Sequence, residues 1–229
     1  MVSRIVFDLD DTLLESGKYY RRQLRQFGEK VLQQFEPIDD VETVLQRQQV
    51  VDREVMGELG LDKSRFLRSL ARTWKWYCKK YDREVSDDDL DECLSIGWGV
   101  YDTIPEPIDG MEDTLERLDD EYDLVLYTMG DPEIQVPKIR HHSLERWFSH
   151  LHIVPEKNRR YLEQVTVPYG VGHTAIIGDS LRGEIQPAIE LGLLAIHRET
   201  EQSWYFHHAE IDEEFPSIQK LPELFEYLP

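Results

Sequence analysis

The sequence has few of the features that mark secreted, membrane-spanning or nucleic-acid-binding proteins. Its 229 residues include only two cysteines, Cys78 and Cys93, with no Cys-x-x-Cys pair. A disulfide framework or a zinc site would need more cysteines or a metal-ligand spacing, so both are expected to be reduced core thiols. No apolar run approaches the ~20 residues that span a bilayer. The first apolar run is broken by Asp8, unlike that of a signal peptide, so a cytoplasmic location is expected.

Positive charge is also scarce, with 26 Lys and Arg against 46 Asp and Glu and a net charge of −20. This balance disfavours a general binder of nucleic acid or of a membrane surface. The charge is unevenly distributed. Residues 15–104 hold 15 basic and 18 acidic side chains, whereas the remainder holds 11 and 28. The shift predicts two differently built parts, and a hydrophobic content of 40% is sufficient for packed cores.

The first informative stretch is a short apolar run, residues 4–7, that stops at Asp8, Asp10 and Thr12. This pattern is typical of a buried parallel strand that delivers carboxylates to its C-terminal edge. Asp8 and Asp10 are two residues apart, so in an extended chain they point the same way. Such carboxylates repel each other unless a cation lies between them, and their hard oxygen atoms suit Mg²⁺. An acidic turn that caps a following helix would have the same composition.

Periodicity predicts helices across residues 15–104 and alternating strands and helices after residue 105. We therefore expect an α/β core, residues 1–14 and 105–229, with a doubly wound parallel sheet and an inserted all-helical domain, residues 15–104. Residues 199–216 are expected to be irregular, and residues 221–228 to form a helix. The predicted strands are 4–7, 123–128, 151–154, 173–179 and 193–197, and the helices between them are 111–118, a stretch interrupted by Pro137, 156–165 and 181–191.

Two groups of side chains in the helical part have an expected structural role. The basic stripe on the third helix is expected to be a solvated face, with a substrate-facing wall as the alternative: Arg65, Arg68, Arg72, Lys75 and Lys79. The tryptophans are expected to belong to its core rather than to a cofactor site: Trp74, Trp76 and Trp98. The pair His207-His208 in the C-terminal part has no convincing metal-ligand spacing, so both are expected on the surface or in the core.

Polar residues also follow the later predicted strands. Thr128 comes at the end of the second strand, Lys157 begins the helix after the third, and Asp179 follows the fourth. The C-terminal ends of parallel strands lie along one edge, so these residues are expected to meet Asp8 and Asp10. Three carboxylates, a hydroxyl and an ammonium suit an Mg²⁺-assisted displacement at phosphorus. In such a reaction one carboxylate attacks and another moves protons.

Four motifs, in order, resemble those of the haloacid dehalogenase-like hydrolases. They are Asp8-Leu9-Asp10-Asp11-Thr12-Leu13, then Thr128, then Lys157, and then the stretch from Gly178-Asp179 to Glu184-Ile185. Lys138 comes too early in the chain to be the third motif. The helical insertion resembles the helical cap of that family. Two positions differ from common members, which often have Asn where this chain has Met129 and Asp where it has Glu184.

The resemblance implies a role for each matched residue and Mg²⁺ as the cofactor. Asp8 would be the nucleophile and a metal ligand, and Asp10 would be the general acid and base and bind the metal through its backbone carbonyl. The phosphate would be held by Thr128 and the backbone amide of Met129. The remaining roles are stabilisation of Asp8 and the phosphoryl group by Lys157, metal binding by Asp179, and support of the metal or of Lys157 by Glu184.

Asp10 favours a phosphatase, because dehalogenating members of this family lack an acid at that position. The expected function is therefore Mg²⁺-dependent hydrolysis of a small phosphorylated metabolite through an aspartyl-phosphate. A phosphotransferase or mutase on the same scaffold is one alternative. A non-catalytic, metabolite-binding regulatory protein is the other, because a fold does not guarantee turnover. The sequence is compatible with a homo-oligomer and does not identify the substrate.

Overall fold

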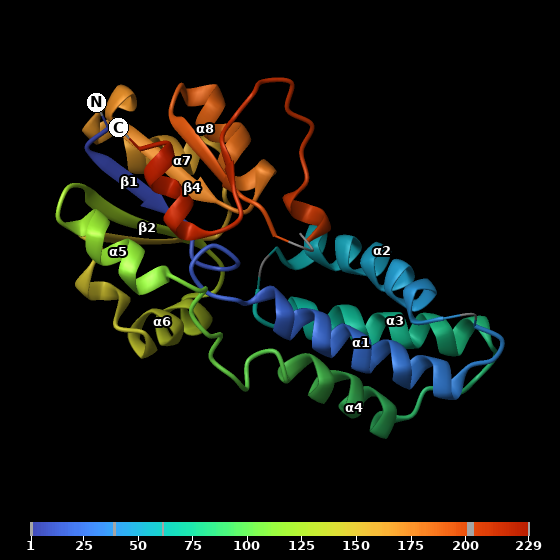
Figure 1. The fold of residues 1–229 in the computed structure, drawn as a ribbon. Helices are drawn as coiled ribbons and strands as arrows, with labels where there is room; N and C mark the ends of the chain where they lie inside the picture. Colours follow the sequence, from blue (N-terminus) through green and yellow to red (C-terminus); the bar gives the residue numbers. More distant parts are fainter. Residues whose placement is uncertain (1, 39, 61, 201–203, 229) are drawn as a thin grey trace. The chain divides into compact units, whose positions relative to one another are not determined.

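The computed structural model describes residues 2–38, 40–60, 62–200 and 204–228. The chain divides into an α/β unit, Met1–Gly17 with Pro105–Pro229, and a helical unit, Lys18–Ile104 (Figure 1). The sequence predicts that the helical insertion starts at residue 15. Residues 15–17 instead belong to the α/β unit, since Leu14 bridges Pro107 and the Glu15 amide donates to the Glu106 carbonyl at 2.9 Å.

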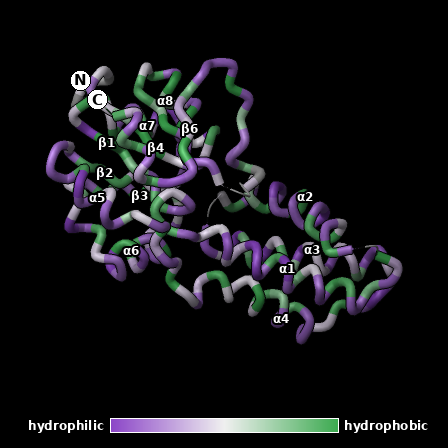
Figure 2. The backbone as a smooth tube through the Cα atoms, viewed as in Figure 1, coloured by the Kyte–Doolittle hydropathy of each residue, from purple (hydrophilic) through white to green (hydrophobic). Residues whose placement is uncertain are grey.

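In the described part of the α/β unit, six parallel strands form one sheet in the order β3-β2-β1-β4-β5-β6. Phe7 of β1 lies in register with Leu126 of β2 and with Ile177 of β4, so the C-terminal ends of these strands are aligned. The central strands are buried on both faces, which explains their continuous apolar sequences (Figure 2). The strands are β1 (Arg4–Phe7), β2 (Asp123–Met129), β3 (His150–Val154), β4 (Thr174–Gly178), β5 (Leu194–Arg198) and β6 (Ser217–Ile218).

Helices cover both faces of this sheet, which confirms the predicted doubly wound α/β core. Adjacent strand residues point to opposite faces, so Phe7 packs with Met111 in one apolar cluster while Val6 packs with Leu162 in another. The helices are α5 (Met111–Asp119), α6 (Pro132–His141), α7 (Arg159–Thr166) and α8 (Gln186–Leu191).

Several predicted elements differ in detail. The helix expected over 156–165 begins at Arg159, because Asn158 caps it by accepting from the Tyr161 amide at 3.0 Å. The helix expected over 181–191 is a π turn, Leu181–Ile185, followed by α8. The terminal helix is a short 3₁₀ segment, Leu221–Glu226. The two-residue strand β6, Ser217–Ile218, was not predicted and directly follows the stretch expected to be irregular. Two residues are too few to show a period in the sequence.

The helical unit has its own apolar core, with α3 packed against α2 and α4. Phe27, Val31, Trp74, Tyr77 and Cys93 are buried within it. Asp40 and Ser86 cap α2 and α4 by accepting from backbone amides, which fixes where those helices start. None of the described helices is long and apolar enough to cross a bilayer. The helices are α1 (Gly17–Gln34), α2 (Val41–Leu59), α3 (Arg65–Lys80) and α4 (Asp87–Trp98).

Two expectations for the helical unit are wrong. Arg65 is buried and forms an ion pair with Asp52 of α2, whereas the other four members of the basic stripe are exposed. The carboxylate of Asp52 compensates the buried guanidinium, so this position belongs to the interface between α2 and α3. Trp98, the last residue of α4, is 44% exposed rather than part of the core, whereas Trp74 is fully buried.

Candidate active site

The deepest part of the candidate site is an ammonium group held between two carboxylates. Lys157 lies in the loop after β3, and its Nζ forms an ion pair with Asp8 Oδ1 and lies 2.5 Å from Glu184 Oε1. All three side chains are almost completely buried. Burial raises the pKa of Asp8, Lys157 opposes this shift, and Glu184 and Asp179 raise the pKa further. The Thr12 hydroxyl donates to Asp8 Oδ2 at 3.1 Å, which orients this carboxylate.

Three buried carboxylates in this region can hold a metal ion. Asp8, Asp179 and Glu184 each offer an oxygen, and these three oxygens lie within 4.8 Å of one another. Three carboxylates carry more negative charge than the ammonium of Lys157 balances, and an all-oxygen donor set suits a hard divalent cation. Glu184 Oε2 also accepts from the Ser180 amide at 2.8 Å, so both of its oxygens are engaged by protein groups. This arrangement favours a supporting role for Glu184.

The position of Glu184 depends on Gly178, the last residue of β4. A Cβ atom on Gly178 would lie 2.7 Å from Glu184 Cγ and 2.8 Å from its Cδ. The absence of a side chain therefore lets Glu184 pass close to the strand and reach Lys157.

We expect Gly178→Ala to displace Glu184 and to destabilise the fold by ~1–3 kcal/mol, the usual effect of overpacking. Any stabilisation of the protein by an added divalent cation such as Mg²⁺ should decrease as well, because the acidic cluster that could hold it is disturbed. Thermal unfolding with and without Mg²⁺ measures both effects. Gly57→Ala is the matched control, since its added Cβ meets no described atom within 4 Å apart from the adjacent helix backbone, and Ala favours a helix. An unchanged melting temperature for Gly178→Ala would contradict this prediction.

Asp10, the second carboxylate of the first motif, has hydrogen-bond partners different from those of Asp8. Its Oδ1 accepts from Lys138 Nζ at 2.7 Å and from the Ser16 hydroxyl, and its Oδ2 accepts from Gln135 Nε2 at 2.7 Å. Burial alone would raise the pKa of Asp10, but Lys138 and these hydrogen bonds lower it below its ordinary value. Asp8 and Asp10 therefore lie in different electrostatic environments.

Thr128 and Met129, at the end of β2, contact Gln135 and Lys157, the partners of the two carboxylates. The Thr128 hydroxyl is buried and accepts from Gln135 Nε2 at 2.6 Å. The sulfur of Met129 lies 3.3 Å from the backbone nitrogen of Lys157. The structure thus brings the sequence-predicted residues to one edge of the sheet: Asp8, Asp10, Thr128, Met129, Lys157, Asp179 and Glu184.

Sequence reasoning gave three side chains at this edge no role in the site: it did not consider Gln135, set Lys138 aside as too early for the third motif, and found no metal-ligand spacing for His207. Gln135 and Lys138 lie three residues apart on α6, a spacing that places both on one face of a helix. Their position just after the strand that ends at Thr128 is the signal that could have identified them. His207 was expected on the surface or in the core, but its Nδ1 lies 3.0 Å from Asp179 Oδ2. Burial lowers the pKa of His207, but Asp179 raises it above its ordinary value.

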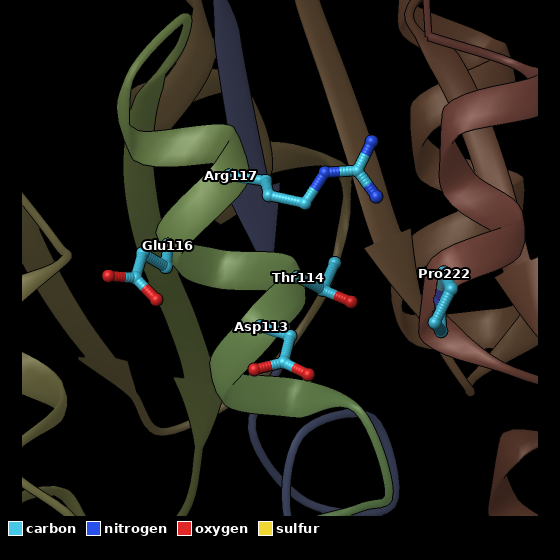
Figure 3. A pocket seen from close by; sticks show the side chains of 5 residues that line it. All are labelled: Asp113, Thr114, Glu116, Arg117 and Pro222. Atoms are coloured by element: carbon cyan, nitrogen blue, oxygen red, sulfur yellow. The ribbon is translucent and has the colours of Figure 1, made fainter.

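A groove of about 410 Å³ on the α/β unit has no part in this arrangement. Figure 3 shows its lining on α5 and on the Leu221–Glu226 segment, with Arg117 and Pro222 on facing sides. The guanidinium of Arg117 lies 3.6 Å from the ring centroid of Phe225. The lining residues include none of the groups around Asp8, so the groove is not considered part of the site.

A protein-family comparison identifies the chain's relatives. The model for the haloacid dehalogenase-like hydrolases matches residues 2–192. The chain belongs to the haloacid dehalogenase-like hydrolase family. No curated protein sequence matches the chain.

Solved structures of haloacid dehalogenase-like proteins share this fold. A family hydrolase from Xanthomonas campestris is 20% identical, with a TM-score of 0.76 over 97% of this chain and 92% of that one. The hydrolase YfnB from Bacillus subtilis is 21% identical, with a TM-score of 0.67 over 99% of both chains. The 2-haloacid dehalogenase from Xanthobacter autotrophicus is 14% identical, with a TM-score of 0.62 over 98% of this chain and 97% of that one. Structures named as phosphatases match as well, so the fold alone does not separate the two reactions.

Proposed function

We propose that this haloacid dehalogenase-like hydrolase is a Mg²⁺-dependent phosphatase that hydrolyses a small phosphorylated metabolite through an aspartyl-phosphate. One observation carries the proposal: a second carboxylate, Asp10, lies beside the site with cationic and amide partners of its own. Two carboxylates in unlike environments suit two chemical roles. Asp8 beside Lys157 is placed to attack, and Asp10 to transfer protons. A dehalogenation has no alkoxide leaving group and does not need the second carboxylate.

The proposed reaction proceeds in two displacements at phosphorus. In the first, an Asp8 oxygen forms a bond to phosphorus, the bond from phosphorus to the leaving oxygen breaks, and Asp10 gives that oxygen a proton. The lowered pKa of Asp10 leaves it ionised in the free site, so this proton is the one that the monoanion of the bound substrate transfers to Asp10 beforehand. In the second, water loses a proton to Asp10 and forms a bond to phosphorus, and the bond to Asp8 breaks. The charge on the transferring group is balanced by Lys157, while the Thr128 hydroxyl and the Met129 amide hold its oxygens.

The acidic cluster is suited to hold the Mg²⁺ of this proposal. The ligands would be Asp8, Asp179 and the backbone carbonyl of Asp10, with Glu184 supporting Lys157 and the cluster. When bound, Mg²⁺ would stabilise the negative charge that develops on the phosphoryl oxygens. YfnB, which shares the fold, was solved bound to magnesium.

Phosphate release tests this function directly. We expect the purified full chain to release inorganic phosphate from a panel of phosphorylated metabolites and from one aryl phosphate in the presence of Mg²⁺. Addition of a chelator should remove the activity, since the buried carboxylates would then lack their counter-ion. The ranking of the panel begins to identify the substrate class.

Other outcomes point to the alternatives. Loss of phosphate from the donor only when a sugar or another acceptor is present would indicate a phosphotransferase or mutase, because the aspartyl-phosphate then passes its phosphoryl group to that acceptor. No release and no transfer from folded protein across the panel would overturn the phosphatase proposal and favour a binding protein.

A further inference from the structure

Both oxygens of the Asp10 carboxylate are held by groups outside the four sequence motifs. Lys138 Nζ donates to Oδ1 and Gln135 Nε2 donates to Oδ2, each at 2.7 Å, and the Ser16 hydroxyl also donates to Oδ1. The side chains of Gln135 and Lys138 are buried, whereas that of Asp10 is 31% exposed. The Asp10 carboxylate is thus accessible to solvent, while two side chains of α6 fix its orientation.

The same amide connects Asp10 to the residue that would hold the phosphate. Gln135 Nε2 lies 2.6 Å from Thr128 Oγ1 and 3.3 Å from the Met129 carbonyl oxygen, in addition to its contact with Asp10. One nitrogen therefore fixes the distance between the end of β2 and the Asp10 carboxylate. Proton transfer to a leaving oxygen requires a set distance between the acid and the bound phosphoryl group.

We propose that Gln135 and Lys138 are positioning residues that hold Asp10 at the leaving-group side of the phosphoryl site. This inference rests on the proposed phosphatase function and deepens it. Neither residue is placed among the reacting atoms: Lys138 acts through Asp10, and Gln135 acts through Asp10 and Thr128. The step they support is the one in which the bond from phosphorus to the leaving oxygen breaks and that oxygen takes the Asp10 proton.

The dependence of kcat/KM on the leaving group distinguishes this positioning role from a purely structural role. A nitrophenyl phosphate releases a stable phenolate that needs little help from an acid, whereas an alkyl phosphate releases an alkoxide that needs a proton. We expect Lys138→Met and Gln135→Glu to lower kcat/KM for the alkyl phosphate by ~10-fold or more, a part of the 10²–10⁴ that a general acid contributes. The loss for the nitrophenyl phosphate should be much smaller. Lys138→Arg should restore part of the lost activity.

The matched control is Arg140→Met, which removes an exposed cation from the same helix and should leave both substrates unaffected. Gln135→Glu is nearly isosteric, so it tests the inference even where Lys138→Met does not fold. Equal losses for both substrates, or a change in KM alone, would overturn the positioning role. An inactive wild-type protein would instead overturn the proposed function, so the two failures are distinguishable.

Discussion

Asp8→Asn is expected to abolish phosphate release, with a loss of ~10⁴-fold or more, while the fold is retained. The amide has the shape of the carboxylate but not its nucleophilic oxygen. Lys157 keeps an ionic partner, because Glu184 Oε1 lies 2.5 Å from its Nζ. Phosphate release under saturating Mg²⁺ measures the effect, and circular dichroism verifies the fold.

The same substitution should not destabilise the protein when Mg²⁺ is absent. Burial and two neighbouring carboxylates raise the pKa of Asp8, so its ionised form is less favourable in the folded than in the unfolded chain. Removing that charge should therefore leave the melting temperature without metal unchanged or raise it. Glu156→Gln, which neutralises an exposed carboxylate next to Lys157, is the control and should be neutral in both assays. Undiminished turnover by Asp8→Asn, after mass spectrometry excludes deamidation to Asp, would contradict the nucleophilic role.

The places of β1 to β5 along the chain and the approach of the motif residues could be predicted because both follow from local patterns. An apolar run that ends at an acid predicts a strand and its edge, and parallel pairing aligns the edges of β1, β2 and β4. The strand pairing therefore places Asp8, Thr128 and Asp179 at the same edge of the sheet, independently of how the connecting helices pack.

Side chains that arrive from helices and loops were harder to predict. Gln135 and Lys138 reach Asp10 only because α6 packs with that face inward, which tertiary packing decides. Trp98 has the same residue type as Trp74, yet its place at the end of α4 leaves it exposed. His207 comes from the stretch after β5, where the sequence has no period to follow, so its contact with Asp179 had no sequence signal.

Lys157→Met is expected to destabilise the protein by ~3–5 kcal/mol when Mg²⁺ is absent, the usual cost of leaving buried charge without its partner. It removes the ammonium group that forms ion pairs with both Asp8 and Glu184. Phosphate release should fall as well, by ~10²–10³-fold, because the charge on the transferring phosphoryl group loses its preorganised partner. Thermal unfolding and phosphate release measure the two losses.

Added Mg²⁺ distinguishes the two contributions of Lys157. A divalent cation near Asp8 and Asp179 replaces some of the lost positive charge, so it should stabilise Lys157→Met more than it stabilises the wild-type protein. Activity should stay low, since the cation cannot take the place of the ammonium beside the phosphoryl group. Arg159→Met, the loss of an exposed cation two residues away, should change neither stability nor turnover. If Mg²⁺ restored both stability and activity of Lys157→Met, Lys157 would be a counter-ion to the carboxylates and not a catalytic residue.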